Sequence, residues 1–490
     1  MPSGELSVGS AITYWAGRDP EAIALVHEGR QITRGELDAR SNRLARAYQG
    51  LGVEPGHIVT LALPNGIEFF EATVGIWKVG ATPQPVSARM PPYERDAIVD
   101  LAQTPIVIGV PLGTYDRPCI PANWTGADGY SSAPVDDIVP PSIKATTSGG
   151  STGRPKVIVS TAPGVIDPTK PMDAARGMTV EGCQLVPGPL YHNGPFGYSS
   201  HGLLLGNTIV MMSRFDAEEV LRLVEEHRVD WMPLVPTMMH RIIRLGPDVL
   251  AKYDVSSLNA IVHFGAACPA FVKQAWIDWL GPERVHEIYG GTEGQGFTWI
   301  TGAEWLEHPG SVGRPIFGRF KVLDEDGEEL PPGTTGEIYM LPDTGPGSTY
   351  RYIGAEPRAR EGWESLGDLG HLDADGWLYL ADRRVNLILS GGANVYPAEV
   401  EAVLDQHPAV LSSVVIGLPD DDMGEVVHAF VQASGVTVEA LQTWVTDRLG
   451  RAKTPRSIEL VDEPLVDDAG KVRRSRLRED YLRRHENHVP

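Results

Sequence analysis

The sequence predicts an α/β protein of two domains. The large N-terminal domain, about residues 1–383, is expected to have parallel-rich sheets covered by helices plus a β-rich subdomain. The small C-terminal domain, about residues 384–490, is expected to be α+β. The chain of 490 residues is too long for one hydrophobic core. Strand and helix patterns alternate in its first part, short strands follow after about residue 317, and the pattern changes again near residue 384.

The first part of the chain contains a strand-helix-strand pattern. A capping box of Thr33 and Glu36 predicts the start of an early helix. Residues 58–63 then have the composition of a buried strand, residues 66–80 that of a helix and residues 81–86 that of a second strand. This order predicts a largely parallel sheet whose faces are covered.

The middle of the chain continues the alternation and then changes. Asp216 and Glu219 predict the start of a helix that ends near residue 228, and residues 231–235 are expected to form a strand. Short strands separated by turns are then expected at residues 321–323, 337–341 and 377–380.

The last hundred residues predict a small α+β domain. Pro397 is expected to begin a helix, because its fixed φ suits the first helical position. Strands are expected at residues 414–416 and 429–431, and a helix at residues 438–449.

Composition restricts the class of protein. The formal net charge is -22, which disfavours nucleic acid and anionic membrane surfaces as partners. The three cysteines, Cys119, Cys183 and Cys268, form no CxxC pair, so we expect reduced thiols rather than disulfides or a structural zinc site. The N-terminus has no signal-peptide pattern and no apolar stretch is long enough to span a bilayer. A soluble, cytoplasmic protein is expected.

The strongest local signal is a segment rich in glycine and hydroxyl groups at residues 146–156. Glycines let the backbone approach a ligand, and hydroxyl and N–H groups can surround a polyphosphate. The segment is not a Walker A loop, because the GK[ST] ending is missing. A flexible polar surface loop is the alternative. The segment reads Thr146-Thr147-Ser148-Gly149-Gly150-Ser151-Thr152-Gly153-Arg154-Pro155-Lys156.

Further candidate binding segments follow the 146–156 segment along the chain. Tyr289-Gly290-Gly291-Thr292-Glu293 offers an aromatic face, a hydroxyl and a carboxylate, which suit a purine, a phosphate oxygen and a hard cation. Asp368 and Arg383 come next, and Lys471 lies in a basic segment near the C-terminus. Taken alone, each of these residues would be assigned to a turn or an exposed surface. Together with the 146–156 loop they resemble the adenylate-forming superfamily of acyl-CoA synthetases, luciferases and peptide-synthetase adenylation domains, over about residues 33–477.

The resemblance implies a nucleotide site. The tyrosine would pack on adenine, Thr292 would hold the α-phosphate, Glu293 would help to hold Mg²⁺, and Asp368 with Arg383 would bind the ribose. The residues that the resemblance assigns to ATP and AMP are Thr147, Ser148, Gly149, Gly150, Ser151, Thr152, Lys156, Gly265, Ala266, Ala267, Tyr289, Gly290, Thr292, Asp368, Arg383 and Lys471.

The resemblance also implies an acyl pocket. His192 would lie beside the acyl carbonyl and shape substrate entry, and small residues near the adenylate motif would leave a roomy pocket. A bulky polycyclic or long-chain acid is therefore expected, since the motifs look closest to those of fatty-acyl and bile-acid coenzyme A ligases. The expected pocket residues are His192, Asn193, Gly194, Gly265, Gly294, Gln295 and Gly296.

The resemblance makes the C-terminal domain a mobile lid. Lys471 would neutralise charge during adenylation. The segment Ser390-Gly391-Gly392-Ala393 would line the coenzyme A path during thioester formation. The family hinge usually carries Lys or Asp and then an acidic residue, where this chain has Val385 and Asn386. The effect of that departure on lid rotation is left open.

The implied reaction joins a carboxylic acid to coenzyme A through an acyl-adenylate intermediate. It consumes ATP and requires Mg²⁺. The catalytic residues would be Lys471, His192, Thr292 and Glu293, with Glu293 at the metal. Two alternatives stay open: delivery of the acyl group to a carrier-protein phosphopantetheine, and a non-catalytic nucleotide-binding protein. Whether the chain is a monomer or a homodimer is also open.

Overall fold

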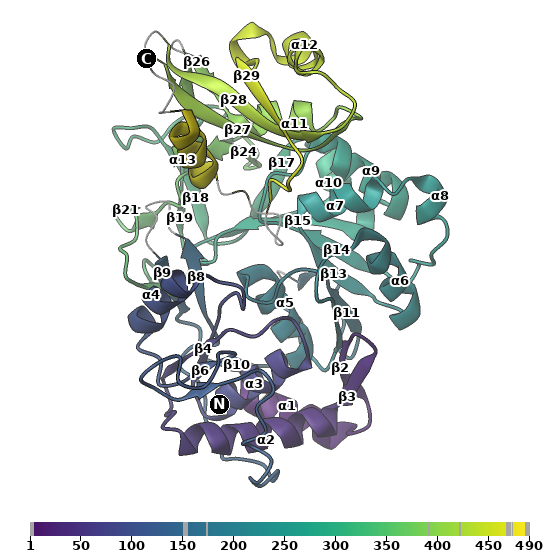
Figure 1. The fold of residues 1–490 in the computed structure, drawn as a ribbon, viewed down its shortest axis with the longest axis vertical. Helices are drawn as coiled ribbons and strands as arrows, with labels where there is room; N and C mark the ends of the chain where they lie inside the picture. Colours follow the sequence, from purple (N-terminus) through teal and green to yellow (C-terminus); the bar gives the residue numbers. More distant parts are fainter. Residues whose placement is uncertain are drawn as a thin grey trace.

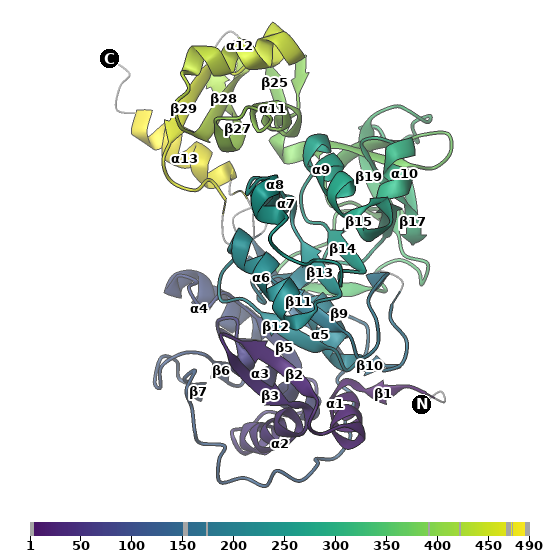
Figure 2. The ribbon, with the colours of Figure 1, turned by 90° about the vertical axis from the view of Figure 1, so that its right-hand side faces the viewer.

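The computed structural model describes residues 4–149, 155–172, 175–390, 393–420, 423–466, 472 and 474–485. A large body contains the N-terminal and middle parts of the chain, and a small C-terminal domain lies at one end of it (Figures 1 and 2). The fold is mixed α/β, as the alternating strand and helix patterns predict.

The largest sheet runs through most of the body. Its strands lie in the order β21-β22-β19-β23-β24-β17-β16-β15-β14-β13-β11-β12-β2-β3, with β18 paired to β19. The steps from β15 through β14, β13, β11 and β12 to β2 are parallel. The strands are β2 (Ile23–His27), β3 (Arg30–Thr33), β11 (Cys183–Val186), β12 (Thr208–Met211), β13 (Trp231–Leu234), β14 (Ala260–His263), β15 (Val285–Gly290), β16 (Phe297–Thr301), β17 (Ser311–Phe317), β18 (Arg319–Leu323), β19 (Gly336–Leu341), β21 (Ala359–Arg360), β22 (Trp363–Glu364), β23 (Asp368–Leu372) and β24 (Leu378–Arg383).

The β-rich part after residue 317 is hydrogen-bonded to this same sheet. Antiparallel pairs join β15 to β16, β16 to β17 and β17 to β24. The predicted short strands at 321–323, 337–341 and 377–380 correspond to β18, β19 and β24. The β-rich subdomain is therefore continuous with the parallel strands, and the residues at their junction can share one site.

The helices of this part are α5 (Asn193–Leu204), α6 (Ala217–His227), α7 (Pro236–Ile243), α8 (Pro247–Leu250), α9 (Ala270–Leu280) and α10 (Gly302–Glu307). The start of α6 confirms the sequence prediction, because Asp216 accepts hydrogen bonds from the N–H groups of Glu218 and Glu219. The helix ends at Arg228, which adopts a left-handed φ of 52°.

A second, fully parallel sheet in the order β5-β4-β6-β7 supports the N-terminal helices. It confirms the predicted strand-helix-strand unit. The capping box also forms, since Thr33 Oγ1 accepts from the N–H of Glu36 and Glu36 Oε2 accepts from the N–H of Thr33. The elements are α1 (Val8–Arg18), α2 (Arg34–Gly50), β4 (Ile58–Leu61), α3 (Ile67–Lys78), β5 (Thr82–Pro85), α4 (Pro92–Ala102), β6 (Val107–Ile108) and β7 (Cys119–Ile120).

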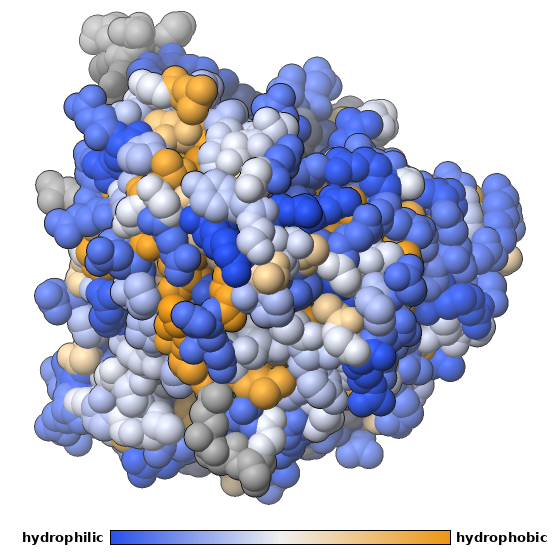
Figure 3. Space-filling model, turned by 90° about the horizontal axis from the view of Figure 1, so that it is seen from below, coloured by the Kyte–Doolittle hydropathy of each residue, from blue (hydrophilic) through white to orange (hydrophobic). Residues whose placement is uncertain are grey.

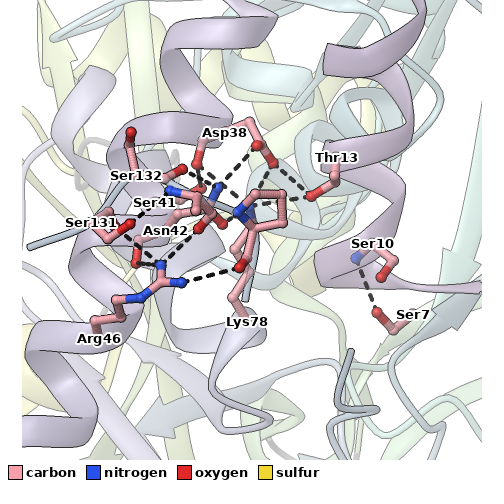
Figure 4. Close-up of polar contacts among 12 residues, drawn as sticks. Ser7, Ser10, Thr13, Asp38, Ser41, Asn42, Arg46, Lys78, Ser131 and Ser132 are labelled. Atoms are coloured by element: carbon pink, nitrogen blue, oxygen red, sulfur yellow. Dashed lines mark hydrogen bonds and ion pairs between the residues drawn. The ribbon is translucent and has the colours of Figure 1, made fainter. Parts of the chain in front are cut away.

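A buried polar network fixes α1, α2 and α3 to one another (Figure 4). The ammonium group of Lys78 donates to Asp38 Oδ1 and to Asn42 Oδ1, both at 2.6 Å. Asn42 Nδ2 in turn donates to the carbonyl oxygen of Ser132 at 3.0 Å. Because the charge of Lys78 is paired with Asp38, its burial is tolerated. The network therefore has a structural role.

Two smaller antiparallel units complete the body. β1 (Leu6–Ser7) pairs with β10 (Val165–Ile166). β8 (Ala145–Gly149), β9 (Pro155–Ser160) and β20 (Tyr350–Ile353) form a three-stranded sheet in the order β20-β9-β8. Residues 150–154, the centre of the predicted phosphate loop, lie outside the described residues.

The C-terminal domain has its own sheet and core. Its five strands run β26-β25-β28-β27, with β29 paired to β28, and α11 and α12 cover the sheet. The strands predicted at 414–416 and 429–431 are the centres of the much longer β27 and β28. The elements are β25 (Ile388–Ser390), β26 (Ala393–Val395), α11 (Pro397–Leu404), β27 (Val410–Asp420), β28 (Gly424–Ala433), α12 (Val438–Leu449), β29 (Ser457–Val461) and α13 (Arg474–His485).

The surface of the body seen from below is mainly hydrophilic, with an apolar band across it (Figure 3). In the parts of the chain that the structure describes, no helix combines the length and apolar character needed to cross a membrane. Cys119, Cys183 and Cys268 are free cysteines.

Candidate active site

A cluster of three side chains joins the end of the large sheet to the three-stranded sheet. Lys156 on β9 places Nζ 3.2 Å from Glu293 Oε1 and 2.8 Å from the hydroxyl oxygen of Tyr352 on β20. Tyr352 donates its hydroxyl proton to the same Oε1 at 2.6 Å. Glu293 is only 6% exposed. Burial, followed by the nearby charge of Glu293, raises the pKa of Tyr352. The cluster thus holds a carboxylate in one orientation beside a cation.

Glu293 has the donor chemistry for a magnesium ion. Both side-chain hydrogen bonds to this carboxylate are to Oε1, so Oε2 has no hydrogen-bond donor among the residues that the structure describes. Mg²⁺ usually takes one or two carboxylates together with substrate phosphates. The described part of the chain contains no group of three or more potential metal ligands. The residues therefore fit an ion held jointly by Glu293 and a phosphate, rather than a preformed cage.

A second cluster lies at the other end of the same motif. Asp368 and Arg383 face each other across the β23–β24 pair. Asp368 Oδ1 lies 3.1 Å from Arg383 Nε, and Asp368 Oδ2 accepts a 2.8 Å hydrogen bond from the hydroxyl of Tyr289. Burial, and then the charge of Asp368, raise the pKa of Tyr289 well above its ordinary value. Three residues predicted separately are therefore in direct contact.

The turn between these clusters is fixed from inside the protein. Gln295 is buried and its Nε2 donates to Glu364 Oε2 at 3.2 Å. The same carboxylate oxygen accepts a 2.6 Å hydrogen bond from the hydroxyl of Tyr350. Gln295 was predicted to line the acyl pocket, and its amide is engaged with Glu364 in this structure. Its assignment to the pocket stays a prediction.

The two glycines of this turn differ in their surroundings. Gly294 has a left-handed φ of 70°, and a Cβ there would lie 3.8 Å from Thr349 Cβ, an ordinary contact distance. A Cβ on Gly296 would lie 2.7 Å from the ring of Phe320, which is too close for an unchanged structure. At Gly294 a Cβ therefore has space, but the left-handed φ strains any residue other than glycine.

The predicted acyl-pocket segments also meet. Gly265 follows β14 with a φ of 86°, and the preceding Phe264 packs against Tyr198 of α5 with ring centroids 5.4 Å apart. A Cβ on Gly194 would lie 2.2 Å from the ring of Phe264, so only glycine permits this close approach. His192 is the N-cap of α5. The segment at 192–194 therefore lies against the segment that contains Gly265.

Sequence reasoning missed Lys144. This residue precedes β8, and its Nζ donates a 2.5 Å hydrogen bond to Asn193 Oδ1. Burial lowers the pKa of Lys144 to about 8. Tyr352 was missed as well. Neither residue lies in a recognisable motif, and the signal that could have found Lys144 is a lysine in the otherwise apolar and hydroxyl-bearing approach to the glycine-rich loop.

The strand before the C-terminal domain connects to that domain directly. Asp382 Oδ2 accepts a 2.9 Å hydrogen bond from the N–H of Ala398 at the start of α11, and Asp382 Oδ1 accepts from Asn386 Nδ2 at 3.1 Å. Arg244, at the end of α7, also donates to the carbonyl oxygens of Pro408 and Val410. In the described part of the chain, the small domain is held to the body by these hydrogen bonds and by ion pairs from Arg384 to Glu325 and Glu337.

The structure describes some of the remaining predicted residues and leaves others outside its described part. Ser390 and Ala393 are paired across β25 and β26. The backbones of Ser148 and Gly149 form the end of β8, and Ala266, Ala267, Gly290 and Thr292 lie on the segments described above. The predicted residues that lie outside the described part of the chain are Gly150, Ser151, Thr152, Gly391, Gly392 and Lys471.

Family models match most of the chain. A model described as AMP-binding enzyme matches residues 12–349, and a model described as AMP-binding enzyme C-terminal domain matches residues 399–470. The first match contains Lys156 and Glu293, and the second covers most of the small domain.

The chain is also similar to individual proteins over nearly its whole length. A feruloyl-CoA synthase of Amycolatopsis sp is 33% identical over 95% of this chain and 97% of its own length. A fatty acid–[acyl-carrier-protein] ligase, ScoC, of Streptomyces coeruleorubidus is 30% identical over 96% of this chain and 95% of its own. The structure of o-succinylbenzoate CoA synthetase from Bacillus subtilis, in complex with its acyl-adenylate intermediate, has a TM-score of 0.82 and 25% identity, and covers 96% of this chain and 98% of its own. The same synthetase is also known in complex with ATP and a magnesium ion.

Proposed function

The chain belongs to the family of AMP-binding enzymes and is an AMP-forming acid–thiol ligase that uses ATP and Mg²⁺; we propose that it activates a hydrophobic, bulky carboxylic acid as an acyl-adenylate and transfers the acyl group to coenzyme A. The observation that carries this proposal is the joining of the two clusters by one motif: Tyr289, with Asp368 and Arg383, at one end, and Glu293, with Lys156, at the other.

The nucleotide would lie between the two clusters. The carboxylate of Asp368 has paired acceptors for the two ribose hydroxyls, and Arg383 supplies a second contact. Lys156 places a positive charge beside the phosphates, and Thr292 offers a hydroxyl to the α-phosphate. The glycine-rich residues 147–152 would surround the remaining phosphate oxygens with N–H and hydroxyl donors.

In the first step the carboxylate of the acid attacks the α-phosphorus of ATP in line, and pyrophosphate leaves. Glu293 would hold a magnesium ion together with the phosphates, and that ion would supply charge neutralisation. Lys471 would approach both the carboxylate and the α-phosphate. No covalent enzyme intermediate is needed, so positioning and charge stabilisation account for catalysis.

In the second step the thiol of coenzyme A attacks the acyl carbonyl, and AMP leaves. We propose that residues 384–490 form a lid that rotates between the steps, removing Lys471 and presenting the Ser390–Ala393 segment to the pantetheine arm. The described contacts between the small domain and the body include polar contacts of Asp382, Arg244 and Arg384, and these support the proposal because such contacts can break and re-form as the domain moves.

The acid would be held between α5 and the turn at 294–296, with His192 at the entry. The small residues Gly265 and Gly294 favour a bulky acyl group. The feruloyl and succinylbenzoate relatives support an aromatic body within this class.

Delivery to a carrier protein is the second candidate, and the ScoC relative favours it. ATP–pyrophosphate exchange over a panel of aromatic, polycyclic and long-chain acids tests the first step. Incubation of the best acid with free coenzyme A or with a phosphopantetheine-bearing carrier protein then separates the two acceptors. Failure of exchange with every acid would contradict the proposal, and thioester formation only on the carrier would favour the alternative.

A further inference from the structure

Lys144 lies beside the predicted acyl-pocket residue Asn193, and it has no carboxylate partner among the residues that the structure describes. Burial lowers its pKa to about 8, and no charged group contributes to that shift. Among the residues that the structure describes, its side chain has a single hydrogen bond, to Asn193. By contrast, the buried Lys78 and Lys273 have carboxylate oxygens at 2.6 and 2.7 Å. A desolvated ammonium group without a counter-ion costs free energy, and such costs are concentrated at functional sites.

The backbone holds Lys144 firmly in place. Its carbonyl oxygen accepts a hydrogen bond from Ser142 Oγ at 2.9 Å and another from the N–H of Ser160 at 3.1 Å. The side chain therefore starts from a fixed point directly before β8, the edge strand of the three-stranded sheet. A group held in this way can be used for recognition, because little conformational entropy is lost on binding.

The ammonium group lies over one face of α5. A Cβ on Gly197 would lie 3.4 Å from Lys144 Nζ, an ordinary contact distance, which places the ammonium group beside this residue. Asn193, Gly197 and His201 are spaced four residues apart and share that face. Phe196 and Leu203 instead point into the hydrophobic core. Asn193, Gly197 and Lys144 all keep partial exposure, whereas Phe196 is buried. The polar face is thus partly exposed to solvent.

The contact with Lys144 also orients the amide of Asn193. An ammonium group has only donors, so the atom that faces it must be the amide oxygen. The Nδ2 group of Asn193 then points away from Lys144, and it donates to no residue in the described part of the chain. Lys144 and Asn193 therefore offer two neighbouring sets of N–H donors.

We propose that Lys144 and Asn193 form a polar subsite in the acyl pocket, which binds an oxygen acceptor on the acid at a point away from the carboxylate that is activated. The proposal rests on the proposed function for the position of the pocket. It restricts the substrate class to hydrophobic acids that carry a second oxygen group: a phenolic hydroxyl, a ketone or a second carboxylate. A purely hydrocarbon acid would leave the ammonium group without an acceptor.

The test compares pairs of acids that differ by one oxygen group. Suitable series are benzoic, 3-phenylpropenoic and ω-phenylalkanoic acids, each unsubstituted, with a 4-hydroxyl and with a 4-carboxyl group, so that neutral and anionic acceptors are distinguished. The kcat/KM of ATP–pyrophosphate exchange is measured for wild type, Lys144→Met and the exposed-lysine control Lys252→Met. ATP-dependent thermal stabilisation checks the fold of each variant.

Wild type and Lys252→Met should prefer the oxygen-bearing member of at least one series by tenfold or more. Lys144→Met should lose that preference by roughly 10–100-fold, the scale of a hydrogen bond to a charged group, and keep its activity on the unsubstituted acid. Equal loss on both members, or a wild-type preference for the unsubstituted acid in every series, would overturn the subsite.

Thermal stabilisation by the acids separates this proposal from the proposed function. Stabilisation by the oxygen-bearing acid in wild type but not in Lys144→Met would support the subsite even if no acid undergoes exchange. Exchange without discrimination at Lys144 would reject the subsite and leave the ligase function intact.

Discussion

Tyr352 donates a 2.6 Å hydrogen bond to Oε1 of Glu293, a residue 59 positions earlier in the chain. The bond joins the turn between β15 and β16 of the large sheet to β20, an edge strand of the three-stranded sheet. Because Oε1 is taken by Tyr352 and Lys156, the rotation of the carboxylate is fixed and Oε2 stays available for a hard cation.

Tyr352→Phe should weaken the use of magnesium. Loss of the hydroxyl removes one hydrogen bond to Glu293, worth about 1 kcal/mol, so the Mg²⁺ concentration for half-maximal exchange should rise by roughly 3–10-fold. Glu293→Gln should raise it further, since an amide is a weaker ligand than a carboxylate. Tyr350→Phe is the matched control, because its hydroxyl donates to Glu364 instead. A shift of equal size in Tyr350→Phe would point to general loosening of the turn.

Gly294→Leu should narrow the range of acids. The position has a left-handed φ, so any side chain adds backbone strain of about 1 kcal/mol. Gly294→Ala has the same strain and little volume, and the comparison of the two variants isolates the effect of size. Relative to Gly294→Ala, the leucine variant should keep exchange on a short acid and lose it on the bulkiest one. Parallel losses on both acids would place Gly294 away from the acyl wall.

Lys471→Ala should separate the two half-reactions. If Lys471 serves adenylation alone, exchange should fall by roughly 10²–10³-fold, and thioester formation from supplied acyl-adenylate should persist. Ala393→Trp is the reciprocal variant, which should block the thiol path and retain exchange. Equal abolition of both steps by Lys471→Ala, in a folded protein, would argue for a single conformation that serves both.

Asp405→Asn should stabilise the small domain at neutral and alkaline pH. Burial raises the pKa of Asp405 from 3.8 to about 7. Between those values the native state holds a proton that the unfolded state has released, so stability falls as the pH rises through that range. An amide does not titrate and can still accept from Ser413 Oγ, which lies 2.7 Å from Asp405 Oδ1.

Urea unfolding from pH 4.5 to pH 8 measures this effect. The advantage of Asp405→Asn should be small at pH 4.5 and reach up to about 4 kcal/mol above pH 7. Asp447→Asn, which alters an exposed carboxylate of the same domain, should follow wild type throughout. An advantage that does not change with pH would mean that Asp405 is ionised over the whole range.

Local sequence signals predicted the helix starts well. The capping box at Thr33, the acidic N-cap at Asp216 and the proline at 397 each act within one helical turn. Strand length was less accessible. β27 continues to Asp420, beyond Gly417 and Pro419, because its pairing with β28 outweighs the local turn preference of those residues.

The sequence predicted some residues of the candidate site and not others. Tyr289, Asp368 and Arg383 lie in recognisable motifs, and the β23–β24 register brings the last two together. The contacts of Tyr352 and Lys144 arise only from tertiary packing, since Lys144 and Asn193 are 49 residues apart. No local pattern marks such residues, so a structure was needed to find them.

Asp382 lies between the proposed ribose site and the small domain. It precedes Arg383, the residue that contacts Asp368, and it accepts the N–H of Ala398 at the start of α11. A displacement of α11 is therefore transmitted to β24, the strand whose Arg383 is proposed to bind the ribose. If nucleotide binding changes the equilibrium between positions of the small domain, then the position of that domain must change the affinity for nucleotide by the same factor. Release of AMP and return of the domain would then occur in one transition, and the hydrogen bond between Asp382 and Ala398 would couple them.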